Sequence, residues 1–281
     1  MKKSIIQTNE PEQGSEYDLS RRFGGIARLY GNQGLEKLAR SHICVIGIGG
    51  VGSWVAESLA RSAVGEITLV DLDVVSESNI NRQLVATEEQ IGRDKTLVMK
   101  ERISQINPVC LVNMVDEFVE LDNIASIIDE RFDFVIDCID DFRTKAALIA
   151  FCRRRKINIL TMGGAGGQVD PSKIKQCDLS RTQHDVLLAK TRKLLRQEYG
   201  FARNVKRTFG VPCVYSDEQL VYPDGQGGLS PQRPPSDPNN TSSNALNCAG
   251  GIGSITHVTG SFAFMAAAFV LNQLVTYDSA K

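Results

Sequence analysis

A glycine-rich turn between an apolar run and a helical segment constrains the fold of this chain more than any other feature. Residues 43–47 (ICVIG) are β-branched and apolar, as in a buried parallel strand. Residues 51–64 repeat apolar side chains at helical spacing. The segment between them reads G-I-G-G-V-G and fits G-x-G-x-x-G, which lets the backbone approach a phosphate at a helix N-terminus. It predicts a nucleotide site without distinguishing NAD, FAD and ATP, with these candidate glycines: Gly47, Gly49, Gly50 and Gly52.

The segments that follow alternate between strand-like and helical patterns. Strand-like runs are expected at 66–71, 110–115, 133–137 and 157–162, and helices at 94–106, 121–130 and 143–155. Such alternation is typical of βαβ units with a parallel sheet covered on both faces. The right-handed crossover rule then favours a doubly wound, mainly parallel, Rossmann-like α/β fold.

The chain has 281 residues, and its pattern changes after Gly163. We expect a flexible N-terminal arm at 1–20, a nucleotide-binding domain at 21–165 and a C-terminal extension at 166–281, on the substrate side. The extension is predicted to hold a basic amphipathic segment at 184–197, a mobile Pro-, Gly- and Ser-rich loop at 222–243 and an apolar helix at 250–275. The helix is long enough to span a membrane, but its Gly, His and Ser/Thr residues favour a core helix. A peripheral or single-span membrane association is therefore disfavoured.

A polar block follows the second expected strand. Asp71 lies 24 residues after Gly47, where a carboxylate can accept hydrogen bonds from a ribose. Two cations come soon after it, Arg82 and Lys95, and two cations near a glycine turn suit a triphosphate better than a dinucleotide. The candidate nucleotide-binding residues of this block are Asp71, Asp73, Asn79, Arg82, Gln83 and Lys95.

Two adjacent acids, Asp140 and Asp141, follow the fourth expected strand. Ligands of open α/β sheets bind outside the carboxyl ends of the strands, so either acid can reach a Mg²⁺ bound to ATP phosphates. Adjacent acids can also form a helix N-cap, in which case only one of them is a ligand. The neighbouring Asp137 has the same alternative of a capping role.

The seven cysteines are spread along the chain, and no two form a C-x-x-C pair. A structural zinc site is therefore not expected. Free cysteines inside apolar runs are typical of a reduced, cytoplasmic protein. Cys248, before a Gly-rich turn, is the best candidate for a thiol near the site, although a buried structural role is equally consistent with its position.

These motifs, in this order and spacing, resemble those of the ubiquitin-activating-enzyme-like superfamily. The segments that carry the resemblance are G-I-G-G-V-G, L-V-D-L-D, S-N-I-N-R-Q, G-x-x-K and D-C-I-D. The resemblance implies a dimeric enzyme that adenylates a carboxylate with Mg-ATP. It also implies catalytic roles for Arg82, Lys95 and Asp140, with Asp140 as the metal-linked acid.

A resemblance to the tRNA threonylcarbamoyladenosine dehydratases covers nearly the whole chain. It rests on RRFGGIARLYG at 21–31, AALIAFCRRRKI at 146–157, MGGAGGQVDP at 162–171, VPCVYS at 211–216 and CAGGIG at 248–253. This family closes the threonylcarbamoyl side chain of a modified adenosine beside the tRNA anticodon into a ring, with loss of water. The alternatives are an adenylyltransferase of sulfur-carrier proteins, whose paired zinc cysteines are missing here, and an NAD-binding module.

The N-terminal motif departs from the sulfur-carrier activators. Gly25 stands where those relatives carry an arginine that enters the partner subunit's ATP site. Arg22 and Arg28 are the candidate replacements. A monovalent cation and a cysteine-desulfurase or sulfur-acceptor partner are left open by the sequence.

The net charge of −1, from 32 basic and 33 acidic residues, excludes a uniformly basic surface but not a local basic patch. Residues 181–210 hold eight Lys/Arg against two acids, a local formal charge of +6. Such clustering is expected where a phosphate backbone binds. Three interleaved aromatic residues, Tyr199, Phe201 and Phe209, are candidates for stacking on a base. The predicted tRNA patch comprises Arg192, Lys193, Arg196, Arg203, Lys206 and Arg207.

Overall fold

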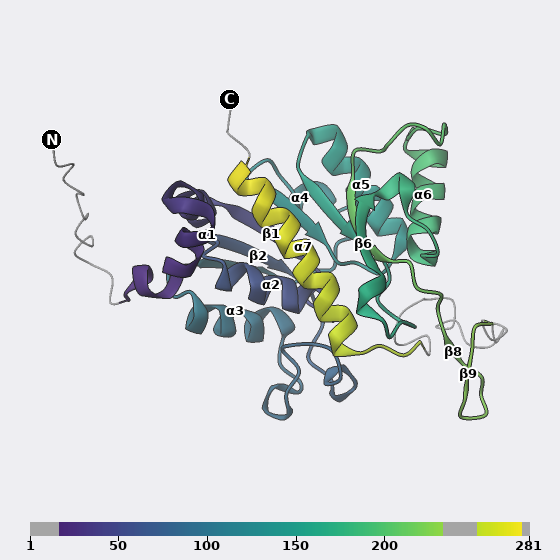
Figure 1. The fold of residues 1–281 in the computed structure, drawn as a ribbon, viewed down its shortest axis with the longest axis horizontal. Coiled ribbons are helices and arrows are strands. Elements are labelled where there is room, and N and C mark those ends of the chain that lie inside the picture. The colour runs from purple at the N-terminus through teal and green to yellow at the C-terminus, as the bar shows by residue number, and fades with distance from the viewer. Residues whose placement is uncertain (1–16, 233–251, 277–281) are drawn as a thin grey trace, which may run out of the picture.

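The structure is a computed structural model that describes residues 17–232 and 252–276. A seven-stranded sheet crosses the molecule in the order β3-β2-β1-β4-β5-β7-β6, and only β6 is antiparallel to its neighbour. Figure 1 shows the sheet with helices on both faces. The predicted doubly wound, mainly parallel α/β fold is confirmed.

The strands are short and most of their residues are buried, as the apolar runs predict. Their bounds are β1 His42–Ile46, β2 Glu66–Val70, β3 Leu111–Val115, β4 Phe134–Asp137, β5 Ile159–Met162, β6 Ile174–Asp178 and β7 Pro212–Ser216. A separate two-stranded ribbon pairs β8 Tyr222–Pro223 with β9 Leu229–Ser230.

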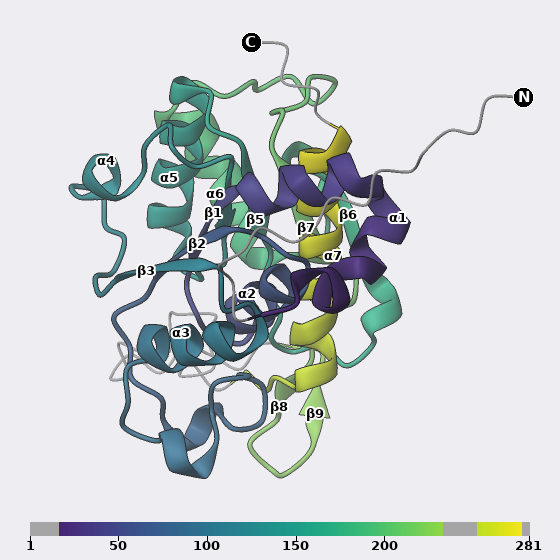
Figure 2. The same cartoon turned by 90° about the vertical axis from the view of Figure 1, so that its left-hand side faces the viewer.

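The helices form one layer on each face of the sheet, seen edge-on in Figure 2. The larger core cluster joins one face to α1 Leu19–Arg40, α2 Gly52–Arg61, α3 Lys95–Ile106 and α7 Thr256–Thr276. The second core cluster joins the other face to α4 Ile124–Ile127, α5 Phe142–Arg155 and α6 Val186–Glu198. Single 3₁₀ turns lie at Glu77–Asn79, Glu88–Gln90, Pro171–Lys173 and Leu179–Arg181.

Helix α7 is the apolar segment whose role the sequence left between core and membrane. It is long and apolar enough to cross a bilayer, but half of its most apolar window is buried inside the protein. Its buried side chains, among them Val258, Phe262 and Val270, belong to the larger core cluster, and Phe269 meets Phe134 of β4 edge-on at 6.1 Å. The helix therefore serves as part of the core layer, where it packs against α1 and α2 and against β5, β6 and β7.

Three elements differ from the sequence-based expectation, each for a local reason. The helix expected at 121–130 shrinks to α4, because the Asn123 side chain binds the backbone of Glu120 and Phe118 instead of allowing an earlier helical turn. Helix α1 was not anticipated, since glycines interrupt its pattern, and Gly31 kinks it with a φ of 73°. The expected loop at 222–243 holds the β8–β9 ribbon, and residues 233–243 lie outside the described part.

Residues after 165 contribute more to the sheet than the sequence indicates. Strand β7 pairs with β5 in parallel, and β6 completes the edge against β7. The sheet therefore continues from the expected nucleotide domain into the expected C-terminal extension. Of the N-terminal arm predicted at 1–20, residues 1–16 lie outside the described residues. The predicted end of the arm is wrong, because Asp18 caps α1 and the helix begins at Leu19.

Candidate nucleotide-binding active site

A cavity of about 600 Å³ opens at the carboxyl ends of β1 and β4. The strand order reverses between these two strands, which is where ligands of open α/β sheets bind. Segments far apart in sequence meet there, from the glycine turn after β1 to the start of α7. The cavity is lined by eleven of the twelve predicted nucleotide-binding residues: Gly47, Gly49, Gly50, Gly52, Asp71, Asp73, Asn79, Arg82, Gln83, Lys95 and Asp140.

The glycine turn needs glycine for steric reasons at two positions. Gly47 has a φ of 86°, a left-handed conformation that disfavours other residues. A Cβ on Gly52 would lie 1.8 Å from the carbonyl oxygen of Gly47, far inside any real contact. This close approach packs the N-terminus of α2 against the turn, and Gly50, Val51 and Gly52 line the cavity there. A helix N-terminus in that position favours an anion such as a phosphate.

Asp71 holds the turn as well as lining the cavity. One carboxylate oxygen accepts a hydrogen bond from the Ile48 N–H at 2.6 Å, and the other accepts from the Asp73 N–H at 2.9 Å. Burial raises the pKa of Asp71, while the charge of Lys95 and the two backbone donors act in the opposite direction. The carboxylate keeps lone pairs for the ribose contact predicted from sequence, because each oxygen can accept more than one hydrogen bond.

Both predicted cations line the cavity, and each is held by this chain's own groups. The Lys95 ammonium lies 2.7 Å from Asp73, and the residue is 4% exposed. Arg82 donates to the Ser78 carbonyl at 2.8 Å and to the Asn81 side chain at 2.9 Å. Two fixed cations beside a backbone anion site can neutralise a polyphosphate without a large loss of side-chain entropy.

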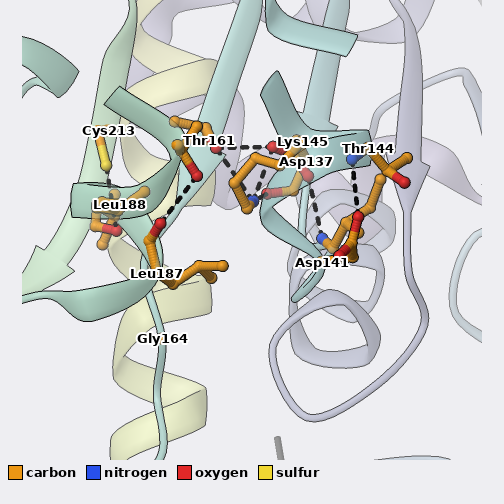
Figure 3. Close-up of polar contacts among 12 residues, drawn as sticks. Asp137, Asp141, Thr144, Lys145, Thr161, Gly164, Leu187, Leu188 and Cys213 are labelled. Carbon is orange, nitrogen blue, oxygen red and sulfur yellow. Dashed lines mark hydrogen bonds and ion pairs between the residues drawn. The ribbon is translucent and has the colours of Figure 1, made fainter. Parts of the chain in front are cut away.

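The two adjacent acids have different roles. Asp141 accepts a hydrogen bond from the Thr144 N–H at 2.8 Å and caps α5, as Figure 3 shows. Asp141 does not line the cavity, so its predicted nucleotide contact is corrected to a capping role. Asp140 lines the cavity and is exposed, and within residues 17–232 and 252–276 no hydrogen bond or ion pair to its carboxylate is found.

The far wall of the cavity was missed by the residue-by-residue reading of the sequence. It comes from the loop after β5, the segment after β3 and the first turns of α6 and α7, and its residues include Gly164, Phe118, Leu187 and Thr259. The Gly164 N–H donates to the buried carboxylate of Asp185 at 2.9 Å, which ties this wall to the start of α6. Periodicity could not predict this wall, because loop residues do not repeat at helical or strand spacing. The sequence signal that could have indicated it is the M-G-G-A-G-G motif after β5.

Cys138 is a thiol at the cavity, but it is poorly suited as a nucleophile. Burial, and secondarily the charge of Asp137, raise the pKa of Cys138 to about 12. A thiol of that pKa is protonated at neutral pH, whereas the thiolate is the reactive form. The other candidate, Cys248, lies outside the described residues.

The N-terminal arginines lie away from this chain's own cavity. Arg22 donates to the carbonyl oxygens of Ile106 and Gln105 at the end of α3. Arg28 lies on the kinked α1 and does not line the cavity. Their contribution to a partner subunit's site stays a prediction.

Only some residues of the predicted tRNA patch are exposed to solvent. Lys193, Arg203, Lys206 and Arg207 are exposed. Arg192 is half-buried, with a guanidinium that donates to the Thr182 hydroxyl and a pKa lowered mainly by burial. Arg192 is thus held by this chain's own hydroxyl group, and its place in the tRNA patch stays a prediction.

All three aromatic residues proposed to stack on a base pack at least partly against the second core cluster. Phe209 is 5% exposed and meets Phe201 edge-on at 5.0 Å, under the guanidinium of Arg196. Tyr199 is half-buried and packs against the second core cluster. Phe209 is therefore buried away from a nucleobase, whereas stacking by the partly exposed Tyr199 and Phe201 stays a prediction.

Residues 20–280 match the ThiF family model. A tRNA threonylcarbamoyladenosine dehydratase of Haemophilus influenzae is 48% identical over 258 residues, which cover 92% of this chain and 95% of that protein. The crystal structure of the Escherichia coli tRNA N6-threonylcarbamoyladenosine dehydratase in complex with ATP has a TM-score of 0.80 and 46% identity, over 92% of this chain and 95% of that one. The molybdopterin-synthase adenylyltransferase of Escherichia coli is more distant, at 31% identity over 48% of this chain and 54% of that protein.

The range matched by the family model includes the cavity, the basic segment and α7, and the two dehydratase matches each cover 92% of this chain. The chain therefore belongs to the ThiF family and, within it, to the tRNA threonylcarbamoyladenosine dehydratases.

Proposed function

We propose that this chain uses ATP to cyclise threonylcarbamoyladenosine in tRNA, releasing AMP and pyrophosphate. The observation that carries the proposal is the cavity at the β1–β4 switch point, where a glycine turn, two held cations and the carboxylate of Asp140 converge. Two of the solved relatives named as dehydratases are complexes, one with ATP and one with AMP, which are the substrate and a product of such a reaction.

In the first step, the substrate carboxylate attacks the α-phosphorus of ATP. A bond forms between a carboxylate oxygen and that phosphorus, and the bond to the pyrophosphate leaving group breaks. The N–H groups at the start of α2 and the cations of Arg82 and Lys95 stabilise the negative charge that moves onto pyrophosphate. Asp71 fixes the glycine turn during this step and offers an acceptor to the ribose.

In the second step, an atom of the carbamoyl group attacks the activated carbonyl carbon. The ring closes as the attacking atom loses its proton to solvent, the bond between the carbonyl carbon and the phosphate oxygen breaks, and AMP leaves with one oxygen of the former carboxylate. The oxygen and proton lost together account for the net loss of water. The nucleophile belongs to the same side chain as the electrophile, so intramolecularity supplies much of the acceleration. The protonated thiol of Cys138 is consistent with a route without a protein thioester.

Mg²⁺ is the metal that the Asp140 position suits. Its preferred environment is one or two carboxylates completed by phosphate oxygens and water, and Asp140 is an exposed carboxylate without a protein partner among the described residues. When bound, Mg²⁺ would neutralise phosphate charge. Asp140 would hold it, and the cap made by Asp141 fixes the turn that carries Asp140.

The exposed cations after α6 suit the tRNA backbone rather than the reacting base. Helix α6 starts at the cavity with Leu187 and has 13 residues, so its far end lies about 20 Å away. Arg203, Lys206 and Arg207 follow that far end. A tRNA whose modified base enters the cavity would place its anticodon stem over these cations, where phosphates can be neutralised.

The remaining expectations concern partners and are part of the same proposal. A homodimer, a monovalent cation and a cysteine-desulfurase or sulfur-acceptor partner stay predictions, as does a cytoplasmic location. The sulfur-carrier alternative predicts pyrophosphate exchange that depends on a carrier protein. The NAD-binding alternative predicts tight binding of NAD without binding of ATP.

The test is mass spectrometry of nucleosides after incubation of modified tRNA with ATP and the purified protein. We expect conversion to the cyclic nucleoside by the wild type and loss of conversion in Asp140→Ala, with the fold retained. The matched control is Asp141→Asn, which keeps a good N-cap while removing the neighbouring charge. Failure of the wild type to cyclise would contradict the proposed function, and full turnover by Asp140→Ala would contradict the role of Asp140.

A further inference from the structure

A buried ionic cluster lies beneath the turn that carries Asp140. The side chains of Lys145 on α5 and Asp137 at the end of β4 are both 0% exposed, with 2.8 Å between the ammonium and Oδ2 of the carboxylate. The Thr161 hydroxyl of β5 donates to the same Oδ2 at 2.7 Å and lies 3.1 Å from the Lys145 nitrogen. Figure 3 shows the three side chains in contact, one from each of three adjacent elements.

The second oxygen of Asp137 faces the turn. Its Oδ1 accepts a hydrogen bond from the Ile139 N–H at 3.0 Å, and the Cys138 N–H donates to the Ile46 carbonyl at 2.9 Å. These two bonds fix the backbone of residues 138 and 139, both of which line the cavity next to Asp140. One end of the carboxylate is thus held by Lys145 and Thr161, and the other end holds the turn.

The cluster is costly as a device for stability alone. A fully buried ion pair must overcome the desolvation of both charges, and apolar residues of similar volume commonly stabilise a fold as well or better. The pair does give what apolar residues cannot, namely a fixed acceptor for the Ile139 N–H and a fixed carboxylate orientation. Because the pair lies directly behind Asp140, we infer that it fixes the geometry of the turn that carries Asp140.

We propose that Lys145 is a positioning residue that acts through Asp137 to fix the carboxylate of Asp140 in the cavity. Thr161 completes the cluster by donating to Asp137 from β5. Lys145 itself is fully buried and does not line the cavity, so it does not touch the nucleotide. The inference rests on the proposed function, because it takes Asp140 as the essential acid.

The decisive variant replaces the pair with apolar residues, Asp137→Leu together with Lys145→Met. This change removes both charges of the pair together. The buried carboxylate of Asp185, which also interacts with Lys145, keeps the charge of Arg192 and the N–H donors of Gly164 and Leu188, so the protein should fold with a Tm near that of wild type. The Ile139 N–H loses its acceptor, and the turn is released. We expect the kcat for cyclisation to fall about 10- to 100-fold, as for a small misplacement of a catalytic group, while the KM for ATP stays near the wild-type value.

A control breaks ion pairs elsewhere in which the carboxylate is buried and the two arginines are exposed. Glu57 of α2 is paired with Arg61 and Arg102 and does not line the cavity, so Glu57→Gln should lower the Tm without changing kcat. A purely structural role for the Asp137–Lys145 cluster would make the two variants behave alike.

A double-mutant cycle with Asp140→Glu then tests whether the cluster acts through Asp140. The glutamate keeps a carboxylate and hence a residual turnover to measure. We expect a non-additive result, in which the Asp137→Leu, Lys145→Met change costs less in the Asp140→Glu background than in wild type. A wild-type kcat in the folded double variant, or strictly additive losses, would overturn the inference.

The proposed function can fail separately from this inference. If wild-type protein forms no cyclic nucleoside, the proposed function is contradicted, and the same variants are compared by exchange of pyrophosphate into ATP. A 10- to 100-fold loss in that exchange, of about the size expected for a displaced catalytic group, would still support the positioning role. An exchange rate equal to that of wild type would overturn it.

Discussion

Replacing Gly52 with alanine is the sharpest test of how the glycine turn works. The added Cβ would lie 1.8 Å from the Gly47 carbonyl oxygen, against the 3.0 Å below which real contacts essentially never occur. The start of α2 and the turn must therefore separate by about 1.2 Å. Because both partners are backbone, no side-chain rotation relieves the clash, and overpacking of this kind costs about 1–3 kcal/mol.

The expected consequences follow from that displacement. A loss of about 1–3 kcal/mol lowers the Tm of a chain of this size by about 2–12 °C. Loss of one backbone hydrogen bond to a charged phosphate oxygen costs about 1.5–3 kcal/mol. The Kd for ATP should then rise by about 10- to 150-fold.

Isothermal titration calorimetry with ATP and thermal unfolding measure the two effects. The control is Gly253→Ala, since a Cβ there meets nothing within 4 Å. This control should bind ATP and unfold as wild type does. An ATP affinity and a Tm equal to those of wild type in Gly52→Ala would refute the steric argument.

Two further predictions concern charge. The pKa of Glu57 is lowered, because hydrogen bonds from Arg102 and Arg61 outweigh the burial that would raise it. The stabilisation by the Glu57 carboxylate is therefore present above the unfolded pKa of about 4.5 and is lost as the pH falls through the lower folded pKa. In urea unfolding, the free energy of unfolding of Glu57→Gln should depend less on pH in that range than that of wild type. Near neutrality it should be lower than that of wild type by about 1–3 kcal/mol. Charge reversal at Lys206 and Arg207 should weaken tRNA binding and reduce the slope of the logarithm of the tRNA binding constant against the logarithm of salt concentration by about 2 or more. A salt slope equal to that of wild type would exclude these two residues from the tRNA interface.

The sequence by itself determined the fold class and most of the nucleotide side of the site. Periodicity reports burial, so the alternating segments up to residue 162 predicted β1 to β5 with errors of one or two residues. The residues that follow those strands had to meet at one edge, because parallel strands place their carboxyl ends together. That is why Gly47, Asp71, Lys95 and Asp140 could be assigned to one cavity before any coordinates were available.

Only the tertiary structure decided the roles that depend on contacts between distant segments. Asp140 and Asp141 are equivalent in a sequence, and their separation required the cap at Thr144. In the sequence, Arg192 cannot be told apart from the other cations of the basic segment. Its partial burial results from the packing of α6 against the second core cluster. The Asp137–Lys145 pair likewise joins a strand to a helix at a point where no periodicity exists. Local sequence patterns indicate which residues are buried. The side chain or backbone group that each buried residue contacts is determined by the packing of the helices on the whole sheet.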